Sequence, residues 1–294
     1  MDRPHGPIGL LEEASSPRGF SITTGRIPIL LKLKRTEELK PHEETVHADL
    51  QGIVKTLGQV PVLRHPIIAD SATGAVLDGT HRLAALKKLG CRTVPAALID
   101  YENPLVQVNR WFRIITGDTL QNFIKRPRQS SASYMSPSDA EQSLLGRSCY
   151  ATLRDKTECL GFKSKEYTPL ALYRHAFQLE QIARYNHMKI AYTDNGEMNQ
   201  VSGSDILMST ICLKKSEVVE SCLGHYLFPP KSTRHLIPSR PLGIGVPLGW
   251  LKNPNVEEAE AEFEKYLAAK RVRRLPEGSM VGSRRYMEEV FLFE

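Results

Sequence analysis

The sequence lacks the paired cysteines that form zinc sites or redox motifs. None of its five cysteines belongs to a C-x-x-C arrangement, and their number is odd. We therefore expect neither a disulfide framework nor a structural zinc site. Reduced thiols are typical of the cytosol, so the sequence predicts a cytoplasmic protein. The cysteines are Cys91, Cys149, Cys159, Cys212 and Cys222.

Long apolar segments are also missing. No run approaches the roughly 20 apolar residues that span a bilayer. The apolar run at 8–11 is too short for a signal peptide, and Glu12 and Glu13 follow it directly. We therefore expect no membrane partner. Residues 1–25 are rich in Pro, Gly and Ser and show no periodicity, which predicts a poorly ordered extension.

The sequence has no G-x-x-x-x-G-K-[ST] motif, which excludes a P-loop kinase. The glycines at 243 and 245 do not form a dinucleotide fingerprint, because Pro247 interrupts the segment. Basic residues exceed acidic ones, with a net charge of +6, which favours anionic partners such as nucleic acid or a phosphorylated small molecule. The densest basic run, 270–274, is interpreted as the last turn of a helix rather than a nucleic-acid tract.

Hydrophobic periodicity predicts a compact α+β unit in the first part of the chain. Two short apolar runs flank a turn with Gly74 and predict a β-hairpin. A glycine, Gly90, closes the second helix. The expected elements are a strand at 27–33, a helix at 45–57, the hairpin strands at 66–70 and 75–78, a helix at 81–89 and a strand at 93–99.

The second half of the chain shows mainly helical patterns. We expect helices at 168–186, 215–223 and 256–273, a mobile Ser-rich and basic loop at 125–138, and a long irregular Pro- and Gly-rich segment at 229–249. Long irregular segments in compact proteins are often functional.

The strongest chemical signal is the segment 76–86, where a buried strand ends in Asp78, a glycine follows, and a helix begins. The first N–H groups of a helix lack intrahelical partners and attract anions. His81 and Arg82 add donors that suit phosphate oxygens. The plainer alternative is a helix capped by Thr80, with Arg82 in solvent.

These residues resemble the ParB/sulfiredoxin superfamily, and within it the free L-serine kinases most closely. The resemblance rests on L-D-G-T-H-R at 77–82, A-L-K-K-L-G at 85–90, the strand at Val94 and Pro95, P-H-E-E at 41–44 and the loop at 229–238. It covers roughly 27–115 and 205–290. It implies an α+β fold with a ParB/sulfiredoxin-like core, a mixed sheet with helices, and a largely helical second region.

The resemblance also implies a role for each matching residue. Glu43 is expected to be the general base, with Glu44 as the alternative, and Asp78 is expected to place the hydroxyl and Mg²⁺. The expected phosphate-binding residues are Gly79, Thr80, His81 and Arg82. The expected substrate-binding residues are Trp111, Lys231, Ser232, Thr233, Arg234 and His235. Taken without the resemblance, Glu43 is a turn residue, Trp111 a core residue and 231–235 a basic loop.

The implied activity is transfer of a phosphoryl group from ADP or ATP, with Mg²⁺, to free L-serine, giving O-phospho-L-serine for amino-acid and cysteine biosynthesis. The implied domains are an extension at 1–25, a nucleotide-binding and catalytic domain at 26–117, and a mainly helical substrate-side domain at 118–294. L-serine and an adenine nucleotide are the expected partners, and nucleic acid is not.

The sequence leaves three alternatives. A ParB-like nucleotide switch or DNA-binding protein carries a glutamate and consecutive arginines after the glycine, where this chain has Thr80, His81 and Arg82, and no helix-turn-helix is evident. A sulfiredoxin-type reductase needs a cysteine at the position of Thr80. The segment 125–138 also suggests a serine kinase with an added regulatory or binding role.

Overall fold

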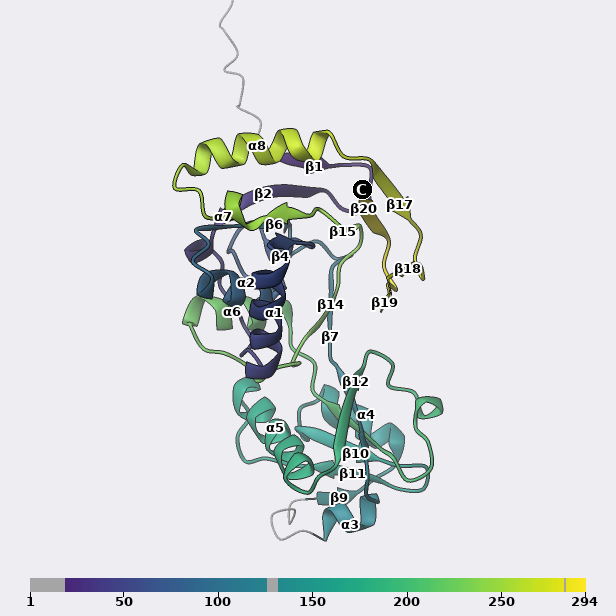
Figure 1. The fold of residues 1–294 in the computed structure, drawn as a ribbon. Coiled ribbons are helices and arrows are strands. Elements are labelled where there is room, and N and C mark those ends of the chain that lie inside the picture. The colour runs from purple at the N-terminus through teal and green to yellow at the C-terminus, as the bar shows by residue number, and fades with distance from the viewer. Residues whose placement is uncertain (1–18, 126–131, 283) are drawn as a thin grey trace, which may run out of the picture.

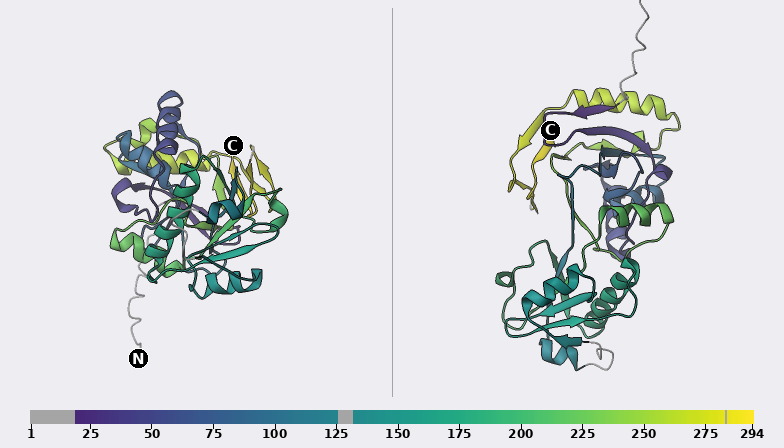
Figure 2. Two further views of the ribbon diagram at one scale, coloured as in Figure 1. Left: turned by 90° about the horizontal axis from the view of Figure 1, so that it is seen from below. Right: turned by 180° about the vertical axis from the view of Figure 1, so that it is seen from behind.

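The chain forms two lobes connected by extended segments, seen from the front in Figure 1 and from below and behind in Figure 2. The computed structural model describes residues 19–125, 132–282 and 284–294. We call residues 19–109 together with 211–294 the upper lobe, and the described residues between 112 and 210 the lower lobe. The beginning and the end of the described chain therefore share one lobe, and the middle of the chain builds the other.

The upper lobe is organised on a five-stranded sheet of order β1-β2-β6-β4-β5. The central strand β6 is antiparallel to β2 and parallel to β4. Nearly all its side chains are buried, as expected for a strand covered on both faces. The strands are β1 (Phe20–Ile22), β2 (Ile29–Arg35), β4 (Ile67–Asp70), β5 (Val76–Asp78) and β6 (Thr93–Ile99). This confirms the α+β class and the strands predicted for this part.

Two helices at the sheet carry the N-terminal part of the site. Helix α1 (His47–Gln59) packs against α2 (Thr80–Lys88), and α2 contacts β4. The buried side chains of α2 are Leu83, Ala85 and Leu86. Both helices lie within two residues of their predicted bounds, because their apolar spacing matches one face of a helix.

The β4–β5 hairpin delivers Asp78 to the start of α2. Its turn is closed by Asp70, whose carboxylate accepts hydrogen bonds from the backbone and hydroxyl of Thr73. The residue after Asp78 is Gly79, the N-cap of α2, with a φ of 108° in the left-handed region that glycine adopts without strain. The predicted hairpin and its junction with the helix are confirmed.

The lower lobe is built on a six-stranded antiparallel sheet of order β12-β8-β13-β10-β11-β9. Helices α4 and α5 each begin with a proline after a Ser136 or Thr168 cap, a favourable helix start. The strands are β8 (Phe112–Thr116), β9 (Ala132–Tyr134), β10 (Ala151–Arg154), β11 (Cys159–Phe162), β12 (Lys189–Thr193) and β13 (Ile206–Thr210). The helices are α3 (Leu120–Ile124), α4 (Pro137–Leu145), α5 (Pro169–Tyr185) and the 3-10 turn η2 (Met198–Gln200).

The region 118–294, predicted to be mainly helical, contains a sheet as well as helices. Helices make up the larger part of its regular structure, but the described middle of the chain is arranged around a sheet. That sheet also takes in β8, which precedes residue 118. Its strands are short and separated by long connections, so their alternation is weak in the sequence.

The C-terminal third returns to the upper lobe in short elements (Figure 1). Strand β14 pairs with β7, β16 pairs with β3, and β15, β20 and β17 form a small sheet. Helix α8 contacts β1 and β2. The elements are η1 (Thr36–Glu38), β3 (Val62–Leu63), β7 (Gln107–Asn109), α6 (Lys215–Gly224), β14 (Arg234–Leu236), β15 (Arg240–Leu242), β16 (Val246–Pro247), α7 (Leu248–Leu251), α8 (Val256–Ala268), β17 (Val272–Leu275), β18 (Met280–Val281), β19 (Arg284–Arg285) and β20 (Val290–Phe293).

The basic run at 270–274 was wrongly interpreted as a helix end. Helix α8 stops at Ala268, and most of the run belongs to β17, which pairs antiparallel with β20. Arg273 forms an ion pair with Glu294 at 2.7 Å and Arg274 with Glu289 at 2.6 Å. Pairing with the final strand, which is distant in sequence, outweighs the local helical pattern.

Three other expectations concern irregular or apolar segments. The extension at 1–25 lies largely outside the described residues, although Phe20–Ile22 forms β1. In the predicted loop at 125–138, residues 126–131 lie outside the described part, Ala132–Tyr134 forms β9, and α4 begins at Pro137. Within the described ranges, no helix combines the length and apolarity needed to cross a membrane.

A buried ion pair within the lower lobe positions the arginine that contacts the upper lobe. The Arg113 guanidinium on β8 donates to the Glu180 carboxylate on α5 at 2.7 Å, and both side chains are almost fully buried. Arg113 also donates to the backbone carbonyls of Trp111 at 2.6 Å and Lys231 at 3.1 Å. Tyr192 completes the arrangement by donating to Glu180 at 2.6 Å.

We predict that Glu180→Ala lowers the free energy of unfolding by about 3–5 kcal/mol, because it leaves the Arg113 charge buried without a partner. The control is Arg184→Ala, which removes an exposed guanidinium 3.9 Å from the same carboxylate and should cost about 1 kcal/mol or less. Urea unfolding measures both variants. Equal small losses would contradict a stabilising role for the buried pair.

Candidate active site

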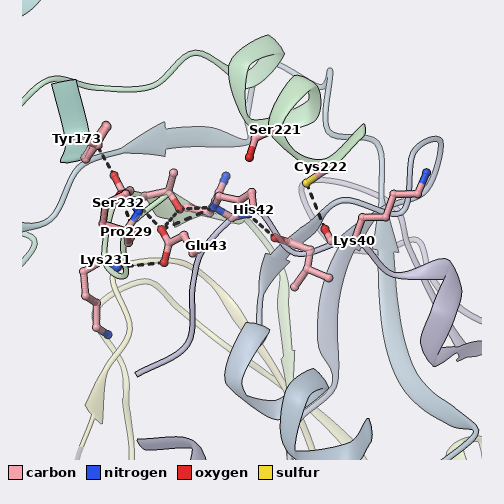
Figure 3. Close-up of polar contacts among 12 residues, drawn as sticks. Lys40, His42, Glu43, Tyr173, Ser221, Cys222, Pro229, Lys231 and Ser232 are labelled. Carbon is pink, nitrogen blue, oxygen red and sulfur yellow. Dashed lines mark hydrogen bonds and ion pairs between the residues drawn. The ribbon is translucent and has the colours of Figure 1, made fainter. Parts of the chain in front are cut away.

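Glu43 lies in the segment before α1, next to the loop formed by residues 229–233 (Figure 3). Its Oε1 accepts hydrogen bonds from the backbone N–H and the hydroxyl of Thr233, both at 2.7 Å. Its Oε2 accepts a hydrogen bond from the backbone N–H of Lys231 at 3.1 Å. The carboxylate is 15% exposed. Glu43 is therefore held in one orientation by three donors while keeping some access to solvent.

The surroundings keep Glu43 ionised. Burial on its own raises the pKa of the carboxyl, but the His42 ring, whose Nε2 lies 3.7 Å away, and the hydrogen bonds from Thr233 outweigh it and lower the pKa to about 2. A carboxylate of this kind accepts hydrogen bonds at neutral pH and is a weak base.

The enclosing loop, residues 229–233, is itself fixed. Ser232 donates its hydroxyl to the Pro229 carbonyl at 2.7 Å, and Tyr173 on α5 donates to the Ser232 carbonyl at 2.8 Å. Lys231 has a φ of 63°, in the left-handed region that is unusual for a residue with a side chain. Backbone strain of this kind persists only where neighbouring contacts impose it.

The neighbouring glutamate has a different environment. Glu44 accepts a hydrogen bond from Arg174 of α5 at 2.5 Å. Its backbone N–H donates to the Phe228 carbonyl. Of the two sequence candidates for the base, Glu43 is thus the one that the 229–233 loop encloses.

Asp78, at the end of β5, faces two guanidinium groups. One of its oxygens lies 3.1 Å from Arg82, and the other accepts a hydrogen bond from Arg240. Burial raises the pKa of Asp78, but the two arginines outweigh it and hold the pKa well below its usual range. Arg82 also donates to the Pro66 carbonyl at 2.6 Å, so it serves largely to fix the junction.

Arg240 was missed by the sequence analysis, because it lies 162 residues from Asp78 and belongs to no motif. It also forms an ion pair with Glu288 at 2.7 Å. Across the described ranges, no group of three or more His, Cys, Asp or Glu side chains is arranged to hold a metal ion.

His81, in the first turn of α2, connects this junction to the Glu43 segment. Its Nε2 accepts a hydrogen bond from the backbone N–H of Val46 at 2.9 Å, which assigns the ring proton to Nδ1. Burial lowers the pKa of His81, so the ring is neutral near pH 7. The starts of α1 and α2 are thereby held together.

A pocket of about 700 Å³ opens between α1, β3 and the start of α2. One part is apolar, with Ile53 and Leu57 of α1 and Val62 of β3 on its walls. The other part is polar and is formed by residues 78–82 together with Lys231. Two groups that the sequence analysis placed in one site, the Asp78–Arg82 segment and the 229–233 loop, therefore meet at this pocket through Lys231.

Trp111 lies beside two cations from the C-terminal loop. The Lys231 ammonium is 5.0 Å from its ring centroid and the Arg234 guanidinium carbon is 5.4 Å away. Arg234 is 6% exposed and donates to the His235 carbonyl at 2.8 Å. Its Nε is buried and has no hydrogen-bond partner among the described residues. A buried donor without a partner is costly, and an acceptor from a ligand would satisfy it.

The remaining predicted loop residues are internal. His235 is buried, and its Nε2 forms a hydrogen bond with the Tyr101 hydroxyl at 2.7 Å. Burial lowers the pKa of His235 to about 3, so it is neutral. Ser232 is also fully buried. Thr233 contacts Glu43, and Gly79 and Thr80 line the pocket. Ser232 and His235 thus position their neighbours in this structure.

Comparisons with known proteins show which chains this one is similar to. No protein-family model matches the chain. An ATP-dependent L-serine kinase of Staphylothermus marinus is 27% identical over 233 residues, which cover 76% of this chain and 91% of the relative. An ADP-dependent L-serine kinase of Thermococcus kodakarensis is 24% identical over 222 residues, covering 72% and 89%.

The decisive observation is structural. A solved free serine kinase variant in complex with ADP matches 75% of this chain and 93% of its own length with a TM-score of 0.65, at 21% sequence identity. The chain has the fold of the free serine kinases. The resemblance to the free serine kinases that was predicted from the sequence is thus confirmed as a similarity in sequence and in fold.

Proposed function

We propose that this chain transfers a phosphoryl group from ADP or ATP to the hydroxyl of free L-serine, giving O-phospho-L-serine. One observation carries the proposal: the loop that binds a fixed, ionised carboxylate also contributes a lysine to the pocket at the anion-attracting start of a helix. Lys231 forms the connection, because its backbone binds Glu43 and its side chain lines the pocket. Similarity to both an ATP-dependent and an ADP-dependent L-serine kinase supports the substrates and leaves both donors open.

The pocket suits a nucleotide. Its apolar walls on α1 and β3 match a purine ring, and its polar part matches phosphate groups. At the start of α2, backbone N–H groups lack intrahelical acceptors and point toward an anion. The Nδ1–H of His81 and the ammonium group of Lys231 supply further donors.

The serine molecule is proposed to lie between Glu43 and Trp111. Its hydroxyl donates to the Glu43 carboxylate, and its own carboxylate accepts from the unpaired Nε of Arg234. Asp194, whose carboxylate is 43% exposed and 3.5 Å from Arg234, is the acceptor for the ammonium group. This arrangement distinguishes a free amino acid from a simple alcohol.

In the transfer, a bond forms between the serine oxygen and phosphorus, and the bond from phosphorus to the bridging oxygen of the nucleotide breaks. The electron pair leaves with that oxygen. Such transition states are loose, so positioning and charge compensation matter most. With its pKa lowered to about 2, Glu43 mainly orients the hydroxyl and receives its proton late in the step.

Magnesium is not assigned a resident site. Asp78, the predicted ligand, faces two arginines, and the described residues provide no cluster of metal ligands. Mg²⁺ usually binds through substrate phosphates and few protein carboxylates. We therefore propose that it enters as part of the nucleotide substrate. The product would feed amino-acid and cysteine biosynthesis in the cytoplasm.

The proposal is tested by incubating the protein with L-serine, Mg²⁺ and either ADP or ATP, and by detecting phosphoserine with phosphorus NMR. We predict that Glu43→Gln lowers turnover by ~10²–10⁴-fold while nucleotide binding persists, because the amide cannot accept the proton. The matched control is Glu44→Gln, which should retain most activity. No phosphoserine with either nucleotide, or normal rates in Glu43→Gln, would contradict the proposal.

We predict that Arg234→Ala raises the KM for serine by ~10–100-fold and leaves the KM for nucleotide nearly unchanged, because it removes a charge-assisted hydrogen bond to the substrate carboxylate. Serinamide, which lacks that carboxylate, should react equally poorly with the wild type and the variant. Steady-state kinetics with both acceptors measures this. A parallel rise in both KM values would assign Arg234 to the nucleotide instead.

We predict that Gly52→Leu weakens nucleotide binding about tenfold or more, a loss of about 1.4 kcal/mol. Gly52 lines the pocket on α1, and a leucine there would occupy it. Gly58→Leu is the control, since Gly58 lies on the same helix but not among the pocket residues. At both positions a Cβ would meet no described heavy atom within 4 Å. Calorimetric titration with ADP or ATP compares them, and equal affinities would place the nucleotide elsewhere.

A further inference from the structure

His42, which received no role from the sequence, is connected to Glu43 by a short chain of hydrogen bonds. The ring is 2% exposed. Its Nδ1 lies 2.8 Å from the Val76 carbonyl of β5, and its Nε2 lies 2.7 Å from the Thr233 hydroxyl. That hydroxyl lies 2.7 Å from Glu43 Oε1. The direct distance from His42 Nε2 to Glu43 Oε1 is 3.7 Å, so Thr233 mediates the contact.

Counting hydrogens shows that this chain of contacts needs one more proton than its neutral members supply. A backbone carbonyl only accepts, so the Nδ1 of His42 must carry a hydrogen. The Thr233 hydroxyl has one hydrogen for two neighbours. Three hydrogen bonds therefore need three hydrogens, whereas a neutral His42, a hydroxyl and an ionised Glu43 bring two. All three contacts become hydrogen bonds only when one further proton is present.

The neighbours decide where that proton lies. Glu43 receives donors: the Thr233 N–H and hydroxyl on Oε1, and the Lys231 N–H on Oε2. Both ring nitrogens of His42 face acceptors, the Val76 carbonyl and the Thr233 oxygen. Hydrogen bonds of these kinds favour an ionised carboxylate and a protonated imidazole. The nearby His235 ring, at 5.6 Å between centroids, is neutral and does not repel a positive charge.

We propose that His42, Thr233 and Glu43 form a triad that holds one shared proton, with His42 as a cationic positioning residue that keeps the Glu43 carboxylate ionised and aimed at the substrate hydroxyl. The shared proton follows from the contacts alone, and only its catalytic use rests on the proposed function. Because Thr233 occupies Oε1 with two donors, Oε2 is the atom that receives the serine hydroxyl. The proton of that hydroxyl moves to Oε2 as the oxygen–phosphorus bond forms, and the triad's own proton stays on His42.

The triad has a direct consequence for pH dependence. Burial raises the pKa of Glu43, and His42 provides the strongest opposing effect. Removing His42 therefore raises that pKa, and activity that needs the ionised carboxylate is lost at a higher pH as the medium is acidified. The other titratable or charged groups around Glu43 come from three helices or strands and one loop: His81 on α2, His235 on β14, Tyr173 on α5, and Lys231 in the facing loop.

The shared proton is tested first without any reaction. In protein labelled with ¹⁵N-histidine at pH 7.5, we expect the His42 ring to show two protonated nitrogens. The signal is identified by its loss in His42→Gln. His235, which is neutral, serves as the internal contrast with one protonated nitrogen. A His42 ring with one unprotonated nitrogen overturns the triad, whether or not the protein makes phosphoserine.

The positioning role is tested by kinetics. We predict that His42→Gln lowers kcat by ~10–100-fold with little change in the KM for nucleotide, as for a displaced catalytic group, and moves the acid limb of kcat to higher pH. Thr233→Val should move the limb in the same direction, whereas Thr233→Ser, which keeps the hydroxyl, should keep the wild-type limb. His225→Asn, at an exposed left-handed residue outside the triad, is the control. An unmoved acid limb in both His42→Gln and Thr233→Val overturns the role.

The two proposals fail separately. If His42 is doubly protonated but the protein makes no phosphoserine, the proposed function is wrong and the triad is supported. If the protein makes phosphoserine but His42 is neutral, the triad is wrong and the proposed function is supported.

Discussion

The candidate site depends on one contact: the carboxylate of Glu43 against the backbone amides of Lys231 and Thr233. These partners are separated by 188 and 190 residues of sequence, and the whole lower lobe lies between them along the chain. Closing so long a loop costs conformational entropy, although the cost grows only slowly with length. Without this closure the site residues of the upper lobe would lie open on one side.

Several buried groups hold the closing loop in place, and they come from both lobes. Tyr173 of α5 fixes the carbonyl of Ser232, and Arg113 of β8 fixes the carbonyl of Lys231. His42, held by β5, reaches the hydroxyl of Thr233 from the other side. The loop itself contains only short irregular backbone, so its shape is imposed by these neighbours and not by local preference.

A second set of charges fixes the phosphate end of the pocket. Asp78 binds Arg82 from its own helix and Arg240 from the C-terminal segments, and Arg240 in turn binds Glu288. The two of these groups that are buried, Arg240 and Glu288, are tolerated there because each has a charged partner. Both oxygens of the Asp78 carboxylate are occupied by arginines. Asp78 is therefore not free to bind a metal ion.

Features formed by neighbouring residues could be predicted from the sequence, whereas contacts between residues far apart in the sequence could not. The hairpin ending in Asp78, the glycine turn and the first two helices follow from periodicity and turn residues within about 45 positions. Arg240, Arg113 and Tyr173 act through contacts with residues far away in sequence, and no local pattern marks them. His42 belongs to the P-H-E-E motif, but the motif does not show its contacts with Val76 and Thr233. The basic run at 270–274 was misread because pairing with β20 outweighs the helical pattern.

The guanidinium of Arg113 donates hydrogen bonds to three acceptors: the Glu180 carboxylate on α5 and the backbone carbonyls of Trp111 and Lys231. Because Arg113 belongs to the lower lobe, the conformation of the 229–233 loop depends on the stability of that lobe. Heat that loosens β8 from α5 would release the Lys231 carbonyl while the five-stranded sheet is still intact. Thermal inactivation would then follow the unfolding of the lower lobe, although that lobe contributes fewer of the reacting groups.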